Sequence, residues 1–300
     1  MQPKTLTQHD CIGLLAPAGK IKKESLDLAV SLLKSWGLQV EVGHNIFSDA
    51  HGYFSGADDE RLADFQQMLD DPRLSAIICA RGGYGSTRII DRLDFTKYLK
   101  HPKWIVGFSD VTALHIRLHQ LGVESIHSAM PIQFPKPEHK DSVESLRKTL
   151  FGETPQLEGK GSAYNRPGAA TGQVVGGNLT LLVDSLGTRT ELNTENKILI
   201  IEEIGEYKYK LDRMLTQLKR CNKLEQLAGL IVGHMTDIQD ADGSFGQTVE
   251  EIILDKTKDH SYPVAFNFPI GHEAPNLAWR HGAKGTLNVS DEISHLTFDL

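Results

Sequence analysis

The chain has 300 residues, of which 40% are hydrophobic and 24% are charged, a composition typical of a folded globular protein. The net charge of −7 at pH 7 and the isoelectric point near 6.0 disfavour a nucleic-acid-binding role, which requires a basic face. The three cysteines are odd in number and far apart, which predicts a reducing compartment rather than a disulfide framework. They are Cys11, Cys79 and Cys221.

The chain also lacks the sequence features of secretion and membrane insertion. The first ten residues are polar and are not followed by the long apolar stretch of a secretory signal. The longest apolar stretches, such as residues 227–232, are far shorter than the roughly 20 residues that a membrane span needs. We therefore expect a soluble cytoplasmic protein that binds no membrane.

Strand-like and helix-like segments alternate through the first half of the chain. Short apolar segments typical of strands lie at 12–16, 38–42, 76–80 and 104–108. Segments with apolar residues three and four positions apart, typical of amphipathic helices, lie at 22–36, 58–69 and 111–121. This alternation predicts the α/β class, with a doubly wound parallel sheet in an N-terminal domain over residues 1–154.

The periodicity stops between residues 155 and 171, which are rich in Gly, Pro, Ser and Asn and are predicted to be an interdomain linker. Further strands are predicted at 172–175, 197–201, 230–232 and 264–268, with helices beginning at 178, passing through 213–218 and spanning 247–254. Residues 283–300 are typical of a hairpin around Ser290. The sequence thus predicts a C-terminal domain over residues 172–300, of mixed α/β type with antiparallel strands.

One segment, K-W-I-V-G-F-S-D-V-T-A-L-H at residues 103–115, runs from an apolar strand through Ser109 into a helix. A serine at such a turn is exposed above the sheet, beside the free N–H groups of the first helical turn, which suits a nucleophile. The hydrolase pattern G-x-S-x-G is only half matched, because Val111 stands where the second glycine belongs. In the alternative interpretation, Ser109 or Asp110 is simply the N-cap of the helix.

A glycine-rich segment, A-R-G-G-Y-G-S-T-R at residues 80–88, follows the buried strand 76–80. Glycines at the end of a parallel strand let main-chain N–H groups approach a ligand closely. Such groups form either an oxyanion hole or a phosphate cradle, and the phosphate motifs G-x-x-x-x-G-K-[ST] and G-x-G-x-x-G are not satisfied here. A tight turn without a ligand remains the alternative.

Two later segments supply an acid and a base. Glu202 and Glu203 come directly after an apolar strand, where open α/β sheets place active residues, and His272 follows a strand and a glycine in F-P-I-G-H-E-A-P-N. A solvated acidic cluster and an incidental loop histidine are the alternatives. A serine nucleophile needs a base, the base needs an acid partner, and the oxyanion needs backbone donors. Taken together, the four segments therefore predict a serine hydrolase.

The same segments resemble the LD-carboxypeptidase family of serine peptidases, which includes the microcin-immunity peptidases. The resemblance covers F-S-G-A-D-D-E-R-L through A-R-G-G-Y-G, then G-F-S-D-V-T-A-L, G-G-N-L at 176–179, I-E-E-I-G-E-Y-K-Y-K-L-D-R-M-L at 201–215 and I-G-H at 270–272. It also includes L-L-A-P-A-G at 14–19, so that nearly the whole chain is covered in order.

The resemblance implies the role of each residue at the site. It assigns Ser109 as the nucleophile, His272 as the base and Glu202 as the triad acid, with Glu203 leaving a one-residue ambiguity. Glu203 stands where many relatives have Asp. The implied oxyanion donors are Gly83, with Gly82 as the alternative, and Asp110.

The family resemblance also implies the reaction, with no metal or cofactor. Such enzymes cut the bond between a dibasic residue and a terminal D-alanine in murein tetrapeptides during peptidoglycan recycling, so the expected partner is a small peptide substrate. A homodimer is implied by the resemblance alone. A carboxypeptidase must also recognise a free carboxylate, for which Arg81 and Arg88 are candidates, with structural ion pairs as the alternative. Tyr84 is a further substrate-binding candidate.

Three other functions remain as alternatives. A microcin-immunity-type peptidase cutting a peptidyl-nucleotide amide needs an aromatic platform, for which Trp279 is the nearest tryptophan to His272 in sequence. A non-catalytic nucleotide- or sugar-binding module would use the glycine turn as a cradle. A metallohydrolase would use His115 and His119, four apart on one helix, but no acid stands between them as in H-E-x-x-H, and we expect a solvated helix face there.

Overall fold

The computed structural model describes residues 1–241 and 243–299. The chain forms two compact units, and each is described by itself. The N-terminal unit contains Met1–Glu153 together with Leu277–Arg280, and the C-terminal unit contains Thr154–Asn276 and His281–Leu300. None of the helices within the described residues combines the length and the apolar character that a membrane crossing demands.

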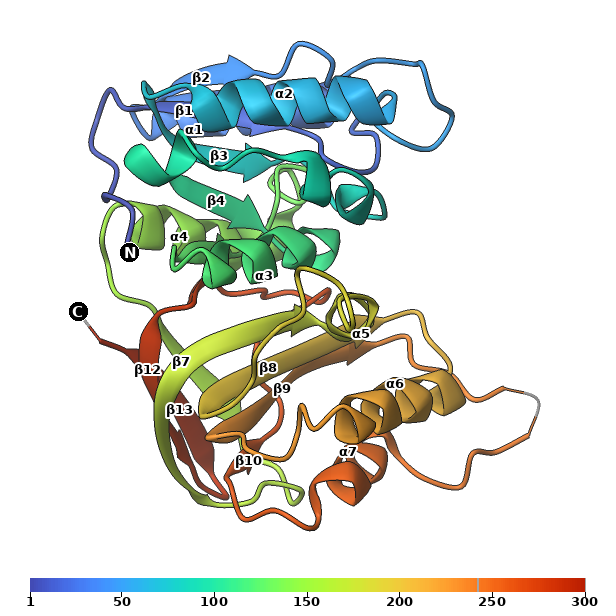
Figure 1. Ribbon diagram of the computed structural model, residues 1–300. Coiled ribbons are helices and arrows are strands. Elements are labelled where there is room, and N and C mark those ends of the chain that lie inside the picture. Colours follow the sequence, from blue (N-terminus) through green and yellow to red (C-terminus); the bar gives the residue numbers. More distant parts are fainter. Residues whose placement is uncertain (242, 300) are drawn as a thin grey trace. The chain divides into compact units, whose positions relative to one another are not determined.

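A six-stranded sheet with the order β11-β5-β4-β3-β1-β2 forms the centre of the N-terminal unit (Figure 1). From β2 to β5 each strand pairs in parallel with its neighbour. The strands are β1 (Cys11–Leu15), β2 (Gln39–Val42), β3 (Leu74–Cys79), β4 (Trp104–Gly107), β5 (Ser125–His127) and β11 (Trp279–His281). The predicted N-terminal α/β domain with its parallel sheet is thus confirmed.

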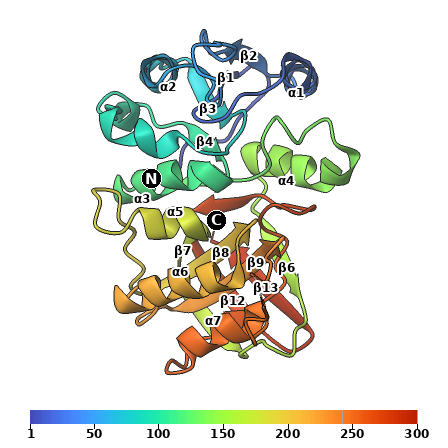
Figure 2. The same cartoon turned by 90° about the vertical axis from the view of Figure 1, so that its right-hand side faces the viewer.

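Helices cover both faces of this sheet (Figure 2). They are α1 (Lys23–Ser35), α2 (Asp58–Asp70), α3 (Thr112–Gln120) and α4 (Lys140–Leu150). Because neighbouring strand residues point to opposite faces, Ile78 packs with the side of α1 and α4, whereas Ile77 packs with the side of α2 and α3. Both strand residues are fully buried, as expected for a doubly wound sheet.

The C-terminal unit contains a seven-stranded mixed sheet with the order β10-β9-β8-β7-β12-β13-β6. The pairs from β10 to β7 are parallel, and those from β7 to β6 are antiparallel. The strands are β6 (Gln156–Lys160), β7 (Gly168–Asn178), β8 (Lys197–Ile204), β9 (Gly229–Thr236), β10 (Val264–Ala265), β12 (Lys284–Val289) and β13 (Ile293–Phe298). The antiparallel strands predicted for this domain, including the C-terminal hairpin, are confirmed.

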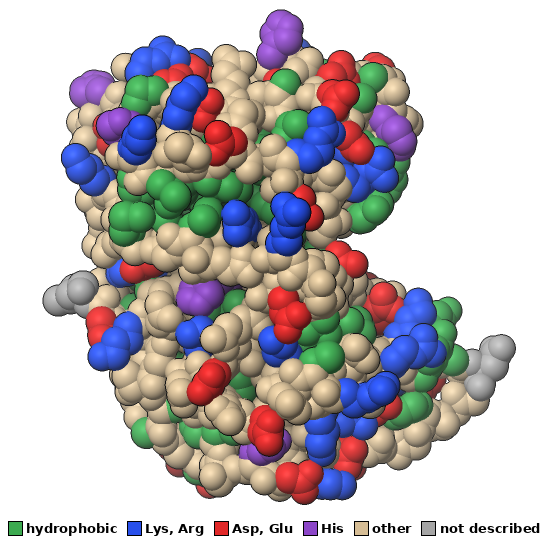
Figure 3. All heavy atoms as spheres, in the orientation of Figure 1, with side chains coloured by type: hydrophobic (Ala, Val, Ile, Leu, Met, Phe, Trp, Pro, Cys, Tyr) green, Lys and Arg blue, Asp and Glu red, His purple; other side chains and the backbone are tan. Residues whose placement is uncertain are grey.

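Three helices accompany this sheet: α5 (Leu179–Asp184), α6 (Lys208–Arg220) and α7 (Val249–Thr257). Lys and Arg side chains gather over the region of α6 at the lower right of Figure 3. Several lysines of this helix form ion pairs, including Lys210 with Glu206 at 3.2 Å and Lys219 with Asp259 at 2.9 Å. Exposed pairs of this kind contribute little to stability and are typical of a solvated helix face.

The structure differs from the predicted domain boundaries in two respects. Residues 155–171, predicted to be a linker, contain β6 and the start of β7. The glycines in this segment reflect close packing, because a Cβ at Gly159 would lie 2.5 Å from the Phe268 ring. The second difference is that Leu277–Arg280 belongs to the N-terminal unit and contributes most of β11, a three-residue strand too short for its pattern to be recognised.

Candidate active site

Ser109 lies at a sharp turn between β4 and α3. It has a backbone φ of +62°, in the left-handed region that a non-glycine residue adopts at a cost of about 1–2 kcal/mol. Gly107 precedes it, and a Cβ there would lie 2.8 Å from Cγ2 of Val111, so the turn requires glycine at this position. The serine is half-buried at the start of the 3₁₀ turn Ser109–Val111. This is the strained strand-to-helix geometry that presents a nucleophilic serine in hydrolases.

The glycine turn lies directly against this serine. A Cβ built on Gly82 would be 3.3 Å from Cβ of Ser109 and 3.5 Å from the backbone nitrogen of Asp110. Gly83, the next residue, has a φ of +107°, which favours glycine. The backbones of the predicted oxyanion segments therefore approach each other beside the serine.

Asp110 ties the nucleophile turn to the glycine turn. Its carboxylate is buried and accepts a hydrogen bond from the backbone N–H of Ser86 at 2.8 Å. Burial raises the pKa of Asp110, while hydrogen bonds from Ser86 and Gly85 lower it, with a smaller lowering by the charge of Arg61. The Asp110 side chain therefore fixes the position of the glycine turn.

Arg61 is a supporting residue that the sequence analysis missed. Its side chain is fully buried on α2, and its guanidinium donates to the carbonyl of Gly85 at 2.9 Å and lies 4.6 Å from the ring centroid of Phe54. The helical spacing to the buried Phe65, four residues later, is the signal that would have placed Arg61 on the inner face.

The three predicted substrate-binding residues lie in different environments. Arg88 forms an ion pair with Asp58 at 2.7 Å, so its charge is used within the fold. Arg81 is exposed and donates to the carbonyl of Lys20 at 2.6 Å, and within the described part of the chain it forms no ion pair with a carboxylate. Tyr84 is 50% exposed beside Phe54, with 5.7 Å between ring centroids. Of the two arginines, it is therefore Arg88 that is paired with a carboxylate within the described part of the chain.

The predicted acid and base meet within the C-terminal unit. Oε2 of Glu202 lies 2.7 Å from Nδ1 of His272. The Glu202 side chain is completely buried at the end of β8, and that of His272 is 15% exposed. Since a carboxylate only accepts, Nδ1 carries the proton, and in the neutral ring Nε2 is the nitrogen that can take up a proton.

The charge of Glu202 also sets the basicity of His272. Burial lowers the pKa of His272, but the hydrogen bond and charge of Glu202 raise it, with help from Glu203, and the net pKa lies above the ordinary value of 6.5. A carboxylate behind an imidazole in this way stabilises the imidazolium that forms when the ring takes up a proton.

Glu203 points to another part of the fold. Its carboxylate accepts hydrogen bonds from the side-chain amide of Asn178 at 3.0 Å, and from the backbone N–H and hydroxyl of Thr180 at 2.8 and 2.7 Å. Asn178 caps α5, so Glu203 holds the start of that helix. Of the two acids that the sequence left as alternatives, Glu202 is therefore the one in contact with His272.

The loop that carries His272 depends on Gly271. Its φ is +128°, and a Cβ there would lie 3.1 Å from Oε2 of Glu202 and 3.1 Å from Cβ of His234. The buried amide of Asn276 accepts the Gly271 N–H at 3.0 Å. A side chain at position 271 would thus crowd both the Glu202 side chain and Cβ of His234.

One prediction about another residue was wrong, and the residue named for one alternative function is not available for it. His115 does not lie on a solvated helix face: it is fully buried, with Nε2 at 2.9 Å from the carbonyl of Gly107 and Nδ1 at 2.7 Å from Oγ of Ser125. Burial lowers the pKa of His115 to about 4. Trp279 is also buried, stacked on His127 with 5.1 Å between ring centroids, so it presents no platform to a nucleobase. His115 lies on α3 and Trp279 lies on β11, and both side chains are buried where these elements pack in the N-terminal unit.

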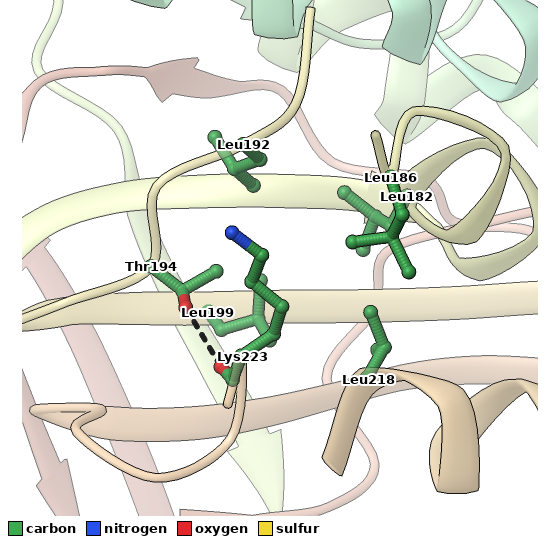
Figure 4. Close-up of a pocket in the computed structure, with 7 residues that line it drawn as sticks. All are labelled: Leu182, Leu186, Leu192, Thr194, Leu199, Leu218 and Lys223. Carbon is green, nitrogen blue, oxygen red and sulfur yellow. Dashed lines mark hydrogen bonds between the residues drawn. The ribbon is translucent and has the colours of Figure 1, made fainter. Parts of the chain in front are cut away.

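Within the described residues, neither a metal-ligand cluster nor the small leucine-lined pocket of the C-terminal unit adds to the predicted site. The described residues contain no group of three or more His, Cys, Asp or Glu placed to hold a metal ion. A small pocket in the C-terminal unit is lined by leucines, including Leu182 and Leu218, together with Thr194 and Lys223 (Figure 4). Lys223 forms an ion pair with Glu191 at 2.6 Å, and none of the predicted site residues lines this pocket.

Comparison with known proteins identifies relatives over nearly the whole chain. Residues 12–128 match the LD-carboxypeptidase N-terminal domain, and residues 171–287 match the LD-carboxypeptidase C-terminal domain. The chain is 37% identical to the probable murein peptide carboxypeptidase of Bacillus subtilis, with 98% of this chain and 93% of the relative covered.

Solved structures are similar as well. The muramoyltetrapeptide carboxypeptidase of Oxalobacter formigenes is 27% identical, with a TM-score of 0.88 over 96% of this chain and 99% of that one. An MccF-like protein of Bacillus anthracis is 22% identical, with a TM-score of 0.87 and 99% of each chain covered, a likeness that concerns the fold alone.

Proposed function

Because the chain belongs to the LD-carboxypeptidase family of serine peptidases, we propose that it releases the terminal D-alanine from L,D-linked murein tetrapeptides. The enzyme is a hydrolase, and Ser109 is its proposed nucleophile. The observation that carries the proposal is the buried carboxylate of Glu202 at 2.7 Å from His272, which prepares this imidazole to act as a base.

The proposed reaction is acyl transfer in two stages. Oγ of Ser109 attacks the carbonyl carbon of the residue before D-alanine, and its proton passes to Nε2 of His272. The tetrahedral oxyanion accepts hydrogen bonds from backbone N–H groups at Gly83 or Gly82 and at Asp110. The carbon–nitrogen bond then breaks, and the imidazolium gives its proton to the departing D-alanine amine.

Water completes the cycle. His272 removes a proton from the water molecule, which attacks the acyl-enzyme ester, and the same proton returns to Oγ of Ser109 as the shortened peptide leaves. The proposal requires the serine hydroxyl of the N-terminal unit to reach Nε2 of the histidine in the C-terminal unit. No step calls for a metal, so we expect full activity after prolonged dialysis against a chelator.

Arg81 and Tyr84 are proposed to bind the substrate. A carboxypeptidase must select peptides with a free carboxylate at the cleaved end, and the guanidinium of Arg81 has no carboxylate partner among the described residues. We expect Arg81→Met to raise KM for a tetrapeptide. The matched control is a tetrapeptide with an amidated C-terminus, whose weaker cleavage should not depend on this residue.

Cellular context is a further part of the proposal. Cys11, Cys79 and Cys221 are free thiols, which suits the cytoplasm, where such an enzyme acts on recycled murein peptides. A homodimer is proposed from the family resemblance. Light scattering on the purified chain tests the dimer, and accumulation of tetrapeptide in the cytosol of a deletion strain tests the role in recycling.

Substrate assays test the activity itself. Purified enzyme is incubated with a murein tetrapeptide bearing a dibasic third residue, and with an aminoacyl sulfamoyl adenylate, the substrate type of the alternative microcin-immunity function. We expect D-alanine release from the tetrapeptide at a kcat/KM well above that for the nucleotide. The opposite preference would favour the alternative, and no reaction of Ser109 with a serine-directed phosphonate would favour a binding module.

A further inference from the structure

A second histidine, His234, lies beside the proposed base. It is a half-buried residue near the end of β9. Its backbone N–H donates to the carbonyl of Ile270 at 2.7 Å, and its Nδ1 accepts the backbone N–H of Glu273 at 3.2 Å. Ile270 and Glu273 lie on either side of His272 in the sequence, so the two hydrogen bonds attach His234 to the loop that carries the proposed base.

The contact through Nδ1 depends on the protonation state of His234. An imidazole nitrogen accepts a hydrogen bond only when it carries no proton, so the neutral ring must hold its proton on Nε2. In the imidazolium form both nitrogens are donors, and Nδ1–H would face the Glu273 N–H. Protonation of His234 therefore removes one of the bonds that flank His272.

The groups around His234 keep it neutral when His272 is at work. Burial lowers the pKa of His234, and the charge of His272 adds to this, whereas Glu273 and Glu202 oppose it. The side chain of Glu273 is itself held by the hydroxyl of Thr236 at 3.0 Å. His234 and His272 thus share one carboxylate neighbour, Glu202, but have pKa values shifted in opposite directions.

We infer that His234 is a positioning residue for the base, which holds the His272 loop through the Glu273 N–H only while its own ring is neutral. This inference rests on the proposed function of His272. The geometry of the loop supports it further, because a Cβ at Gly233 would lie 2.4 Å from the carbonyl of Ile270, so β9 and the loop are already in close contact. A loss of the side-chain bond would act directly on the placement of the imidazole.

Two substitutions separate the hydrogen bond from simple packing. In His234→Asn, the amide oxygen takes the place of Nδ1 and can still accept the Glu273 N–H. In His234→Gln, which is closer to histidine in size, the amide lies near the position of Nε2 instead. We expect kcat to stay within about threefold of the wild type for Asn and to fall about tenfold or more for Gln, with KM little changed, since small misplacements of a catalytic group slow the reaction. Equal kcat values for the two variants, or a better Gln variant, would overturn the inference.

The pH profile gives a second, independent test. If both histidines must be neutral, the acid limb of log kcat/KM in the wild type approaches a slope of 2, whereas His234→Asn, which cannot take up a proton, shows a slope of 1 on the same substrate. Because the pKa of His234 is lowered and that of His272 is raised, the second unit of slope develops only at the more acidic end of the profile. A wild-type slope that stays at 1 below the pKa of His234 would contradict the inference, whatever the variants do.

A measurement without substrate separates this inference from the proposed function. NMR titration of the imidazole signals in the resting protein reports the pKa of His234. We expect this pKa to be higher in His272→Gln, which removes the positive charge that disfavours protonation of His234. An unchanged pKa of His234 contradicts the coupling of the two rings, while failure of the enzyme to cleave any peptide contradicts the proposed function alone.

Discussion

The two halves of the proposed site are built by different physical means. In the N-terminal unit the chemistry depends on the backbone: Ser109 is held in a left-handed conformation, and Gly82 brings its main chain against Cβ of that serine. In the C-terminal unit it depends on side chains, with a completely buried carboxylate at Glu202 and an imidazole at His272. We therefore expect substitutions in the N-terminal half to act through backbone conformation. Substitutions in the C-terminal half should act through the loss of a buried charge and its hydrogen bond.

Both halves nevertheless contain a glycine at which two segments approach each other closely. At Gly82 and at Gly271, an atom of a predicted site residue lies within 3.5 Å of the position that a Cβ would occupy. In the first case the neighbours are Ser109 and the Asp110 nitrogen, and in the second the neighbour is the carboxylate of Glu202. The comparison teaches that each half of the site is assembled by close approach between segments that are distant in sequence.

The largest expected effect is the removal of the nucleophile. Ser109→Ala should lower kcat/KM for the tetrapeptide by at least about a thousandfold, because no other group attacks the carbonyl. D-alanine release measures this. Ser109→Gly serves as the matched variant: it should be equally inactive but about 1 kcal/mol more stable than Ser109→Ala, since glycine adopts the left-handed conformation without strain. Equal stabilities of the two variants would show that the left-handed conformation at position 109 is not strained.

Replacing the acids distinguishes charge from structure in the other half. Glu202→Gln should lower kcat by roughly 10³–10⁴-fold, since a neutral amide does not stabilise the imidazolium by charge and its NH2 group can donate to Nδ1, which favours the wrong tautomer. Glu203→Gln should act mainly on stability, costing about 1–3 kcal/mol, because it disturbs a buried acceptor of hydrogen bonds from α5. Kinetics and denaturant unfolding on the same pair measure both effects. A greater loss of kcat in Glu203→Gln than in Glu202→Gln would show that Glu202 is not the triad acid.

A methyl group at position 271 tests the close approach in the C-terminal half. Gly271→Ala places a Cβ 3.1 Å from Oε2 of Glu202, and we expect kcat to fall by about 10–100-fold as the carboxylate moves from His272. Gly187→Ala is the control, because Gly187 also has a positive φ, of +74°, but nothing lies within 4 Å of its Cβ position. The control should lose stability without loss of kcat, and a parallel loss of kcat in both would point to backbone strain alone.

The smallest effect is expected in the pH dependence. The base must be neutral to accept the serine proton, so a raised pKa of His272 places the acid limb of kcat/KM above the ordinary histidine value of 6.5. In Glu202→Gln the hydrogen bond and charge that raise this pKa are lost, and the residual activity should show its acid limb at lower pH. A limb that moves to higher pH, or does not move, would contradict the electrostatic role given to Glu202.

Local patterns predicted most of the regular structure. The apolar segments and helical spacing correctly indicated β1, β3, β4 and α1 to α3, because each element is long enough for its period to be visible in its own residues. Two short strands, β5 and β11, were missed because three residues show no period. The glycine-rich start of the second domain was taken for a linker, although its glycines pack closely against other strands.

The candidate site shows the same division. Ser109, His272 and the pair Glu202 and Glu203 could be identified by their positions after apolar strands and by the family resemblance. His234 and Arg61 could not, because their roles depend on hydrogen bonds to backbone atoms far away in sequence, at Glu273 and Gly85.

The sequence by itself determined which residue types stand at the ends of strands, since a strand and its following turn are encoded locally. Only the tertiary structure decided which of two adjacent glutamates faces the histidine. Successive side chains of a strand point to opposite sides, and the loop carrying His272, 70 residues after Glu202, packs on one side only. That choice is made by the packing of β8, β9 and the loop.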